Sequence, residues 1–90
     1  MRAVARHVVV HGRVQGVFFR ESTRRRADRA GVAGWITNRS DGAVEGWFEG
    51  AEDDVAALVD YARRGPSGAE VQRVDVDDVE PEGLGGFDVR

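Results

Sequence analysis

A loop with two glycines, Gly12 and Gly16, separates an apolar run from a segment of helical pattern that begins near Arg20. Backbone N–H groups converge on an anion where such a loop leads into a helix N-terminus. An arginine in the first helical turn is unfavourable against the helix dipole, and a bound phosphate would offset that cost through charge-assisted hydrogen bonds. The loop therefore predicts a phosphate cradle completed by Arg20. A plain strand-to-helix turn with a solvated arginine is the alternative.

Residue types missing from the chain exclude several phosphate chemistries. The chain contains no lysine, and its loop lacks the spacing of a nucleotide-binding P-loop. It contains no cysteine, so a thiolate nucleophile, a disulfide and a cysteine-based metal site are excluded. His7 and His11 fall in one predicted strand, about 13 Å apart at about 3.3 Å per residue, too far to share an ion. We therefore expect these histidines to hold no metal ion. We also expect no cofactor.

Hydrophobic periodicity indicates the elements that must position this loop. Strands are predicted over residues 4–11, 32–39, 43–49 and 70–79, and helices over residues 21–30 and 52–64. The order β-α-β-β-α-β is typical of the ferredoxin-like α+β sandwich, in which two helices cover one face of an antiparallel sheet. A short fifth strand is expected at Phe87–Arg90.

The hydrophobic pattern also predicts the apolar face of the first helix and an irregularity in the fourth strand. The apolar face of the first helix is expected to comprise Phe19, Thr23, Ala27 and Ala30. In the fourth strand, Val71 and Val79 are out of step with the alternation of Val74 and Val76, which indicates a bulge or a shorter strand.

Length and charge limit the class and the partners of the protein. Ninety residues predict one domain over residues 1–90. No window resembles a membrane span or a signal peptide, so we expect a cytoplasmic protein. Residues 1–40 carry a formal charge of +7 and residues 41–90 one of −10. The basic run Arg24–Arg26 either steers small anions or forms the solvated face of a helix, and we favour the second interpretation.

A second polar feature, Gly34-Trp35-Ile36-Thr37-Asn38, ends the second predicted strand. In a ferredoxin-like sheet the first two strands run parallel with the third between them, so their C-terminal ends lie about 10 Å apart. Asn38 is therefore expected to face the cradle, with room for a small phosphate ester or anhydride between them. A turn asparagine bonded to its own backbone is the alternative.

Together the two segments resemble the signatures of the acylphosphatase family. The first resembles Gly-x-Val-Gln-Gly-Val-x-Phe-Arg, matched at Gly12, Val14, Gln15, Gly16, Val17, Phe19 and Arg20. The second is similar to Gly-Trp-x-x-Asn-x-x-x-Gly-x-Val, matched at Gly34, Trp35, Asn38, Gly42 and Val44. The resemblance extends over the whole chain. Ile36 and Thr37 depart from the family pattern, and Thr37 stands where a basic or long residue is common.

This resemblance implies hydrolysis of the carboxyl–phosphate bond of small acyl phosphates to a carboxylate and inorganic phosphate. It also implies no metal and no covalent intermediate. The phosphate would be held by the Arg20 guanidinium and by the backbone amides of Val14, Gln15, Gly16, Val17 and Phe18. Asn38 would orient the attacking water. The carboxylate leaving group needs no general acid, so positioning and charge stabilisation suffice for the reaction. We therefore expect Glu21 and Asp41, which lie near the two motifs, to be surface residues without a catalytic role.

Two other interpretations remain. RNA-recognition domains share the element order, but their aromatic signature is absent from the third predicted strand and the net charge is −3. A domain of a carbamoyl-phosphate-using maturation protein is the other, and a chain of 90 residues argues against it. The expected partners are an acyl phosphate substrate and inorganic phosphate or sulfate as a bound anion. No nucleic acid or membrane partner is expected, and we expect a monomer.

Overall fold

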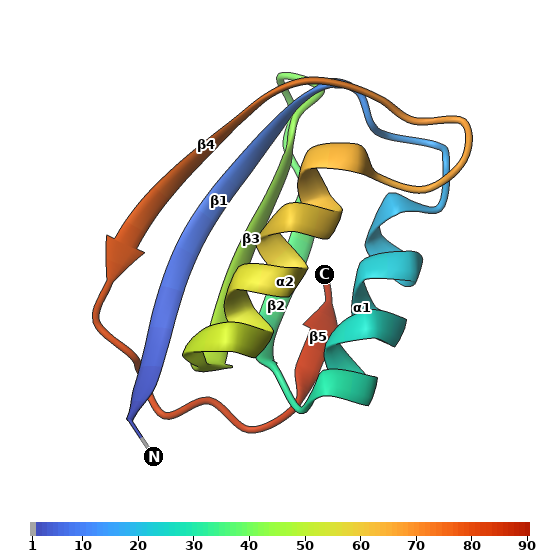
Figure 1. The fold of residues 1–90 in the computed structure, drawn as a ribbon. Coiled ribbons are helices and arrows are strands. Elements are labelled where there is room, and N and C mark those ends of the chain that lie inside the picture. Colours follow the sequence, from blue (N-terminus) through green and yellow to red (C-terminus); the bar gives the residue numbers. More distant parts are fainter. Residues whose placement is uncertain (1) are drawn as a thin grey trace.

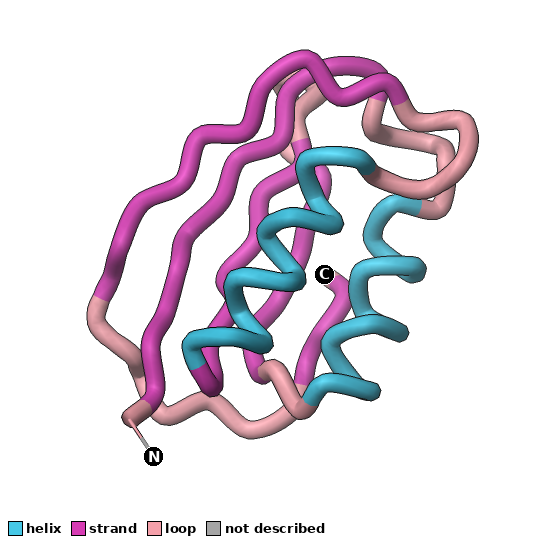
Figure 2. Tube along the Cα trace, in the orientation of Figure 1, coloured by secondary structure: helices cyan, strands magenta, loops and turns pink. Residues whose placement is uncertain are grey.

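The computed structural model describes residues 2–90 and contains two helices and a five-stranded sheet (Figure 1). The elements are β1 (Ala3–Arg13), α1 (Phe19–Ala30), β2 (Ala33–Asn38), β3 (Val44–Ala51), α2 (Glu52–Arg64), β4 (Glu70–Val79) and β5 (Phe87–Val89). Both helices lie on one face of the sheet, which curves around them (Figure 2). The predicted ferredoxin-like α+β architecture is confirmed.

The strand order in the sheet is β4-β1-β3-β2-β5. The first four strands pair antiparallel with their neighbours, whereas β5 runs parallel to β2. The sheet is therefore mixed rather than antiparallel throughout. After β4 the chain runs past the ends of the strands, at the bottom of Figure 1, and returns along the outer edge of β2. As expected, β1 and β2 are parallel and separated by β3, which brings their C-terminal ends to the same end of the sheet.

The bounds of α2 and β4 agree with the predicted ranges, and the first helix begins two residues earlier than predicted, at Phe19. Phe19, Thr23 and Ala27 are buried, and the Thr23 hydroxyl donates to the Phe19 carbonyl at 2.8 Å. The expectation that Ala30 faces the core is wrong. Ala30 lies in the last turn of α1 and lines a groove between the two helices instead.

A bulge lies where β4 pairs with the end of β1. His11 is opposite Arg73 and Gly12 is opposite Val71, so β4 has one extra residue at this point. The extra residue returns Val71 to the core-facing side that Val74 and Val76 occupy, so the expected bulge is confirmed at Val71. The pairing of β4 with β1 is continuous from Val74 to Val79, so the bulge does not account for Val79. Gly12 has φ 131°, and a Cβ atom there would lie 2.1 Å from the Glu70 carbonyl oxygen, so only glycine fits.

Glu49 is the one buried charged side chain within residues 2–90. Its carboxylate accepts hydrogen bonds from the Trp47 indole and from three successive backbone N–H groups, those of Glu82, Gly83 and Leu84. Burial raises the pKa of Glu49, but these hydrogen bonds outweigh it and hold the pKa below its usual value. This contact anchors the loop that carries the chain from β4 to β5.

Across residues 2–90, neither helix has the length and apolar character needed to cross a membrane.

Candidate active site

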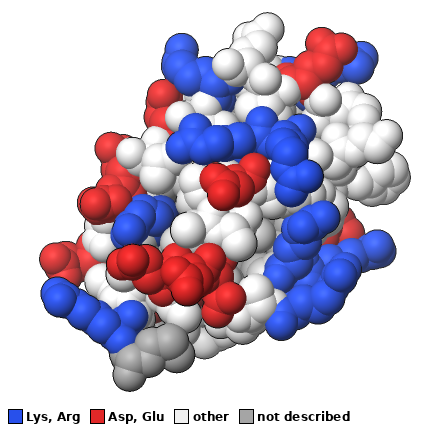
Figure 3. Space-filling view, viewed as in Figure 1, with Lys and Arg blue, Asp and Glu red and all other residues white. Residues whose placement is uncertain are grey.

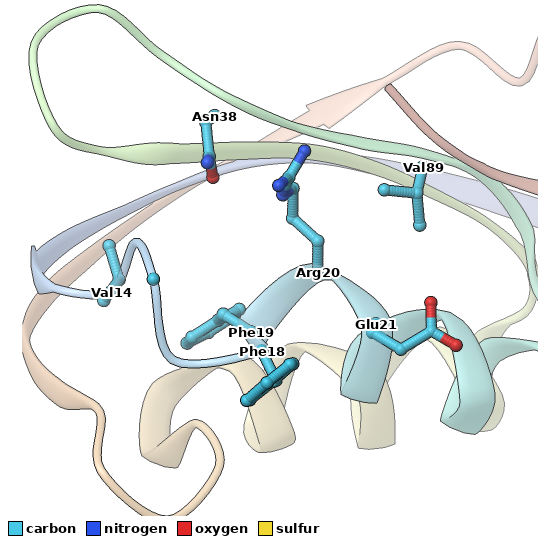
Figure 4. A pocket seen from close by; sticks show the side chains of 8 residues that line it. Val14, Phe18, Phe19, Arg20, Glu21, Asn38 and Val89 are labelled. Carbon is cyan, nitrogen blue, oxygen red and sulfur yellow. The ribbon is translucent and has the colours of Figure 1, made fainter.

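Four residues of the predicted cradle, Val14, Gly16, Phe18 and Arg20, line the same pocket as Asn38, and the pocket has a volume of about 340 Å³ (Figure 4). Its lining residues are Val14, Gly16, Phe18, Phe19, Arg20, Glu21, Asn38 and Val89. Arg20 comes from the first turn of α1 and Asn38 from the end of β2, and the Arg20 guanidinium points toward Asn38 (Figure 4). The fold thus joins the two polar features that the sequence pattern singled out.

The loop between β1 and α1 leaves backbone donors free beside this pocket. Gly16 has φ 75° and Phe18 has φ 61°, and left-handed residues in a bent loop form the concavities lined by N–H groups that bind anions. Within residues 2–90, the N–H groups of residues 15–18 donate to no backbone carbonyl. Four consecutive donors are therefore available at the start of α1, where the helix dipole adds to their field.

The side chain of Gln15 holds this loop against the turn that follows Asn38. Its amide nitrogen donates to the Arg39 carbonyl at 2.8 Å and to the Ala43 carbonyl at 3.0 Å. Asp41 shapes the same turn, because its carboxylate accepts the Ala43 N–H at 3.1 Å and pairs with Arg39 at 3.0 Å. The Ala43 N–H and then Arg39 lower the pKa of Asp41. The bridge from Gln15 fixes the position of the cradle relative to β2.

The Arg20 guanidinium is held by Arg90, the last residue of the sequence. Its Nη1 donates to the Arg90 carbonyl at 2.9 Å, and the Arg90 guanidinium lies 4.9 Å from the centre of the Trp35 ring. A guanidinium carries five N–H donors, so the remaining donors of Arg20 stay available to an anion. Sequence reasoning missed Val89 and Arg90 as part of the site. The expected edge strand at Phe87–Arg90 was the one signal for them, and it did not indicate which strand they would join.

Glu21 lines the pocket, but its carboxylate is paired with arginines of its own helix. Arg24 donates to it through two nitrogens, Nε and Nη2, and Arg25 pairs with it at 3.5 Å. The Arg24 hydrogen bond is the main cause that lowers the pKa of Glu21. A carboxylate paired in this way stays ionised and is poorly suited to move protons.

The basic run at the centre of α1 is also partly engaged. Arg24 bonds Asp28 at 2.7 Å in addition to Glu21, and Arg26 stacks over the Tyr61 ring at 4.0 Å. Figure 3 shows basic side chains gathered over α1 and acidic side chains over the first turn of α2. These contacts are typical of a solvated helix face, the interpretation that we favoured for this run.

The two histidines of β1 each contact a different carboxylate. His7 lies 2.6 Å from Glu45 and His11 lies 3.0 Å from Asp75. Arg73 and then His11 lower the pKa of Asp75. Over residues 2–90, no three histidine, aspartate or glutamate side chains lie close enough together to hold a metal ion.

Comparisons with known proteins identify the family. The sequence model of the acylphosphatase family matches residues 6–89. An acylphosphatase of Thiobacillus denitrificans is 52% identical over 84 residues, covering 93% of this chain and 93% of that protein. The structure of an acylphosphatase from Coxiella burnetii superposes with a TM-score of 0.93 and 39% identity, covering 98% of this chain and 93% of the other.

A longer protein also contains a related segment. The structure of full-length HypF in the phosphate- and nucleotide-bound form superposes with a TM-score of 0.91 and 28% identity over 99% of this chain, but over 12% of its own length. The near full-length matches therefore favour the enzyme over both alternatives, the RNA-binding module and the domain of a maturation protein. The chain belongs to the acylphosphatase family and is an acylphosphatase, a hydrolase.

Proposed function

We propose that this enzyme hydrolyses the carboxyl–phosphate bond of small acyl phosphates in the pocket between the cradle and Asn38. The proposal assigns phosphate binding to Arg20 and to the backbone amides of residues 14–18, and it assigns orientation of the attacking water to Asn38. The observation that carries it is that Gly16 and Phe18, whose N–H groups donate to no backbone carbonyl, line one pocket together with Arg20 and Asn38.

The donor set matches the charge and shape of a phosphate group. The guanidinium is planar and forked, so it can bind two phosphate oxygens and remains charged at any working pH. The loop amides and the helix dipole complement the remaining negative charge. The contact between Arg20 and the Arg90 carbonyl orients the guanidinium before substrate arrives, which lowers the entropy lost on binding.

The reaction that we assign needs few side chains. Asn38 holds a water against phosphorus, the new P–O bond forms to that water, and the P–O bond to the acyl oxygen breaks. The electron pair leaves with the carboxylate, a weak base that needs no proton. The water proton passes to a phosphate oxygen of the substrate. Glu21 is unsuited to that role, because Arg24 and Arg25 engage its carboxylate.

Substitution of Arg20 is the test. We expect Arg20→Ala to abolish measurable turnover of benzoyl phosphate and to weaken inhibition by inorganic phosphate. We expect Arg20→Lys to recover part of the binding and little of kcat, because a lysine keeps the charge but not the fork. Arg25→Ala, on the same helix but outside the pocket, is the matched control. Near-normal kcat/KM in Arg20→Ala would remove Arg20 from the site.

Four expectations from the sequence remain predictions alongside this proposal. They are a metal-independent reaction, phosphate or sulfate as the bound anion, a monomer, and a cytoplasmic location.

A further inference from the structure

Two large hydrophobic side chains are exposed within residues 2–90, and both line the pocket that holds Arg20 and Asn38. They are Phe18, with 82% of its surface exposed, and Val89, with 40% exposed. Scattered apolar residues on a protein surface need no explanation, but two that line one polar pocket give that pocket apolar surface on two sides. Figure 4 shows them on different sides of Arg20, with Phe18 at the start of α1 and Val89 beside the guanidinium.

The backbone of Phe18 has a conformation that is costly for an aromatic residue. Phe18 has φ 61° and ψ 25°, and it is the one non-glycine residue with positive φ within residues 2–90. Glycine or asparagine adopts this conformation at lower cost than an aromatic residue does. The ring neither suits its backbone nor packs in the core. A strained residue at a site points to a role outside folding.

The place of these side chains suggests what they contact. The phosphate occupies the cradle formed by the loop amides and Arg20, so the acyl group must extend toward the open mouth of the pocket. Phe18 and Val89 stand at that mouth, because both are exposed and both line the pocket. An apolar acyl group covering them would remove apolar surface from water, whereas a small polar acyl group would not.

We infer that Phe18 and Val89 bind the acyl group and make the enzyme prefer acyl phosphates with an apolar acyl group, such as benzoyl phosphate, over small ones such as acetyl phosphate. This inference rests on the proposed function. It assigns specificity to two residues that contact the acyl group, which the phosphate cradle does not contact. The contribution is to binding shared by ground state and transition state, so it should appear in KM more than in kcat.

The test is the ratio of kcat/KM for benzoyl phosphate to that for acetyl phosphate. We expect Phe18→Asn to lower this ratio about 10-fold, mainly through KM for benzoyl phosphate, because hydrophobic contacts of this size are worth about 10-fold or more. Asparagine tolerates the left-handed conformation, so the melting temperature should not fall. Phe18→Leu keeps an apolar side chain and should retain most of the ratio. Val89→Thr, a swap of nearly equal volume, should lower it about 3-fold.

If the ratio in Phe18→Asn stays within 2-fold of the wild-type ratio, the inference is overturned. This holds even if kcat/KM falls for both substrates because the substitution disturbs the backbone of the cradle. Arg25→Ala is the control outside the pocket and should leave the ratio unchanged, because any steering acts alike on two substrates that share a phosphate group. If the unmodified enzyme hydrolysed neither substrate, the proposed function and this inference would both fall. If the unmodified enzyme hydrolyses acetyl phosphate and Phe18→Asn leaves the ratio unaltered, the inference is overturned and the proposed function stands.

Discussion

Replacing Glu49 with glutamine tests how the loop before β5 is held. Glu49 is 4% exposed. Its Oε1 accepts the Glu82 N–H at 2.8 Å and the Trp47 indole N–H at 3.0 Å, and its Oε2 accepts the N–H groups of Gly83 and Leu84 at 2.8 and 2.9 Å. All four partners are donors, so a carboxylate suits this position and a carboxamide does not.

The magnitude follows from this count of donors. Glutamine retains one acceptor oxygen and places an NH₂ group against two N–H groups, whichever way the amide is turned. A buried donor left without an acceptor costs about 1–3 kcal/mol. The free energy of unfolding should therefore fall by about 3 kcal/mol, a large share of the 5–15 kcal/mol typical of a domain. At about 4–8 °C per kcal/mol for a domain of this size, the melting temperature should fall by more than about 10 °C.

Urea denaturation at pH 7, followed by tryptophan fluorescence, measures this change. Glu45→Gln is the matched control, because Glu45 lies on the same strand, is 28% exposed and contacts one partner, His7. A pair exposed to this degree contributes about 1 kcal/mol or less. Equal destabilisation by the two substitutions would refute the reasoning, since it would mean that the four donors do not depend on the carboxylate.

The pH dependence gives a second measurement on the same variant. The hydrogen bonds to Glu49 outweigh its burial and lower its folded-state pKa below the ordinary value of 4.5. The unfolded chain therefore binds the proton at higher pH than the folded chain does. The stabilisation is fully present above the unfolded pKa and is lost as the pH falls through the lowered folded pKa. The difference between wild type and Glu49→Gln should be constant near pH 7 and narrow below about pH 4.5. A difference that is independent of pH would contradict this.

Three further predictions concern the active site. Asn38→Ala should lower kcat on benzoyl phosphate about 100-fold or more while leaving the phosphate inhibition constant near wild type, and loss of phosphate binding would show that the division of roles is wrong. Gln15→Ala should raise KM and lower the melting temperature by several degrees, because two hydrogen bonds worth about 1 kcal/mol each anchor the cradle. Phosphate at ten times its Kd should stabilise the fold by about 1.4 kcal/mol in calorimetry, and Arg20→Ala should abolish that shift.

Local physical chemistry explains what the sequence determined by itself. The helix at residues 52–64 was predictable because its apolar residues recur at helical spacing, with acids in the first turn and arginines in the last. Strands were predicted at residues 32–39 and 43–49, and β2 and β3 lie there and pair antiparallel. The element order then implied the topology. That topology placed Arg20 and Asn38 at the same end of the sheet, and both line one pocket.

The tertiary structure alone decided the contacts between segments far apart in the chain. Gln15 reaches carbonyls 24 and 28 positions away, Glu49 reaches N–H groups 33 to 35 positions away, and Arg20 reaches a carbonyl 70 positions away. Periodicity and turn residues report on neighbours within a few positions, so they contain no signal for these partners. The parallel pairing of β5 with β2 brings Val89 to the pocket. Pairing along an exposed strand edge depends on where the packed helices and loops leave that edge open, and no short stretch of sequence specifies that.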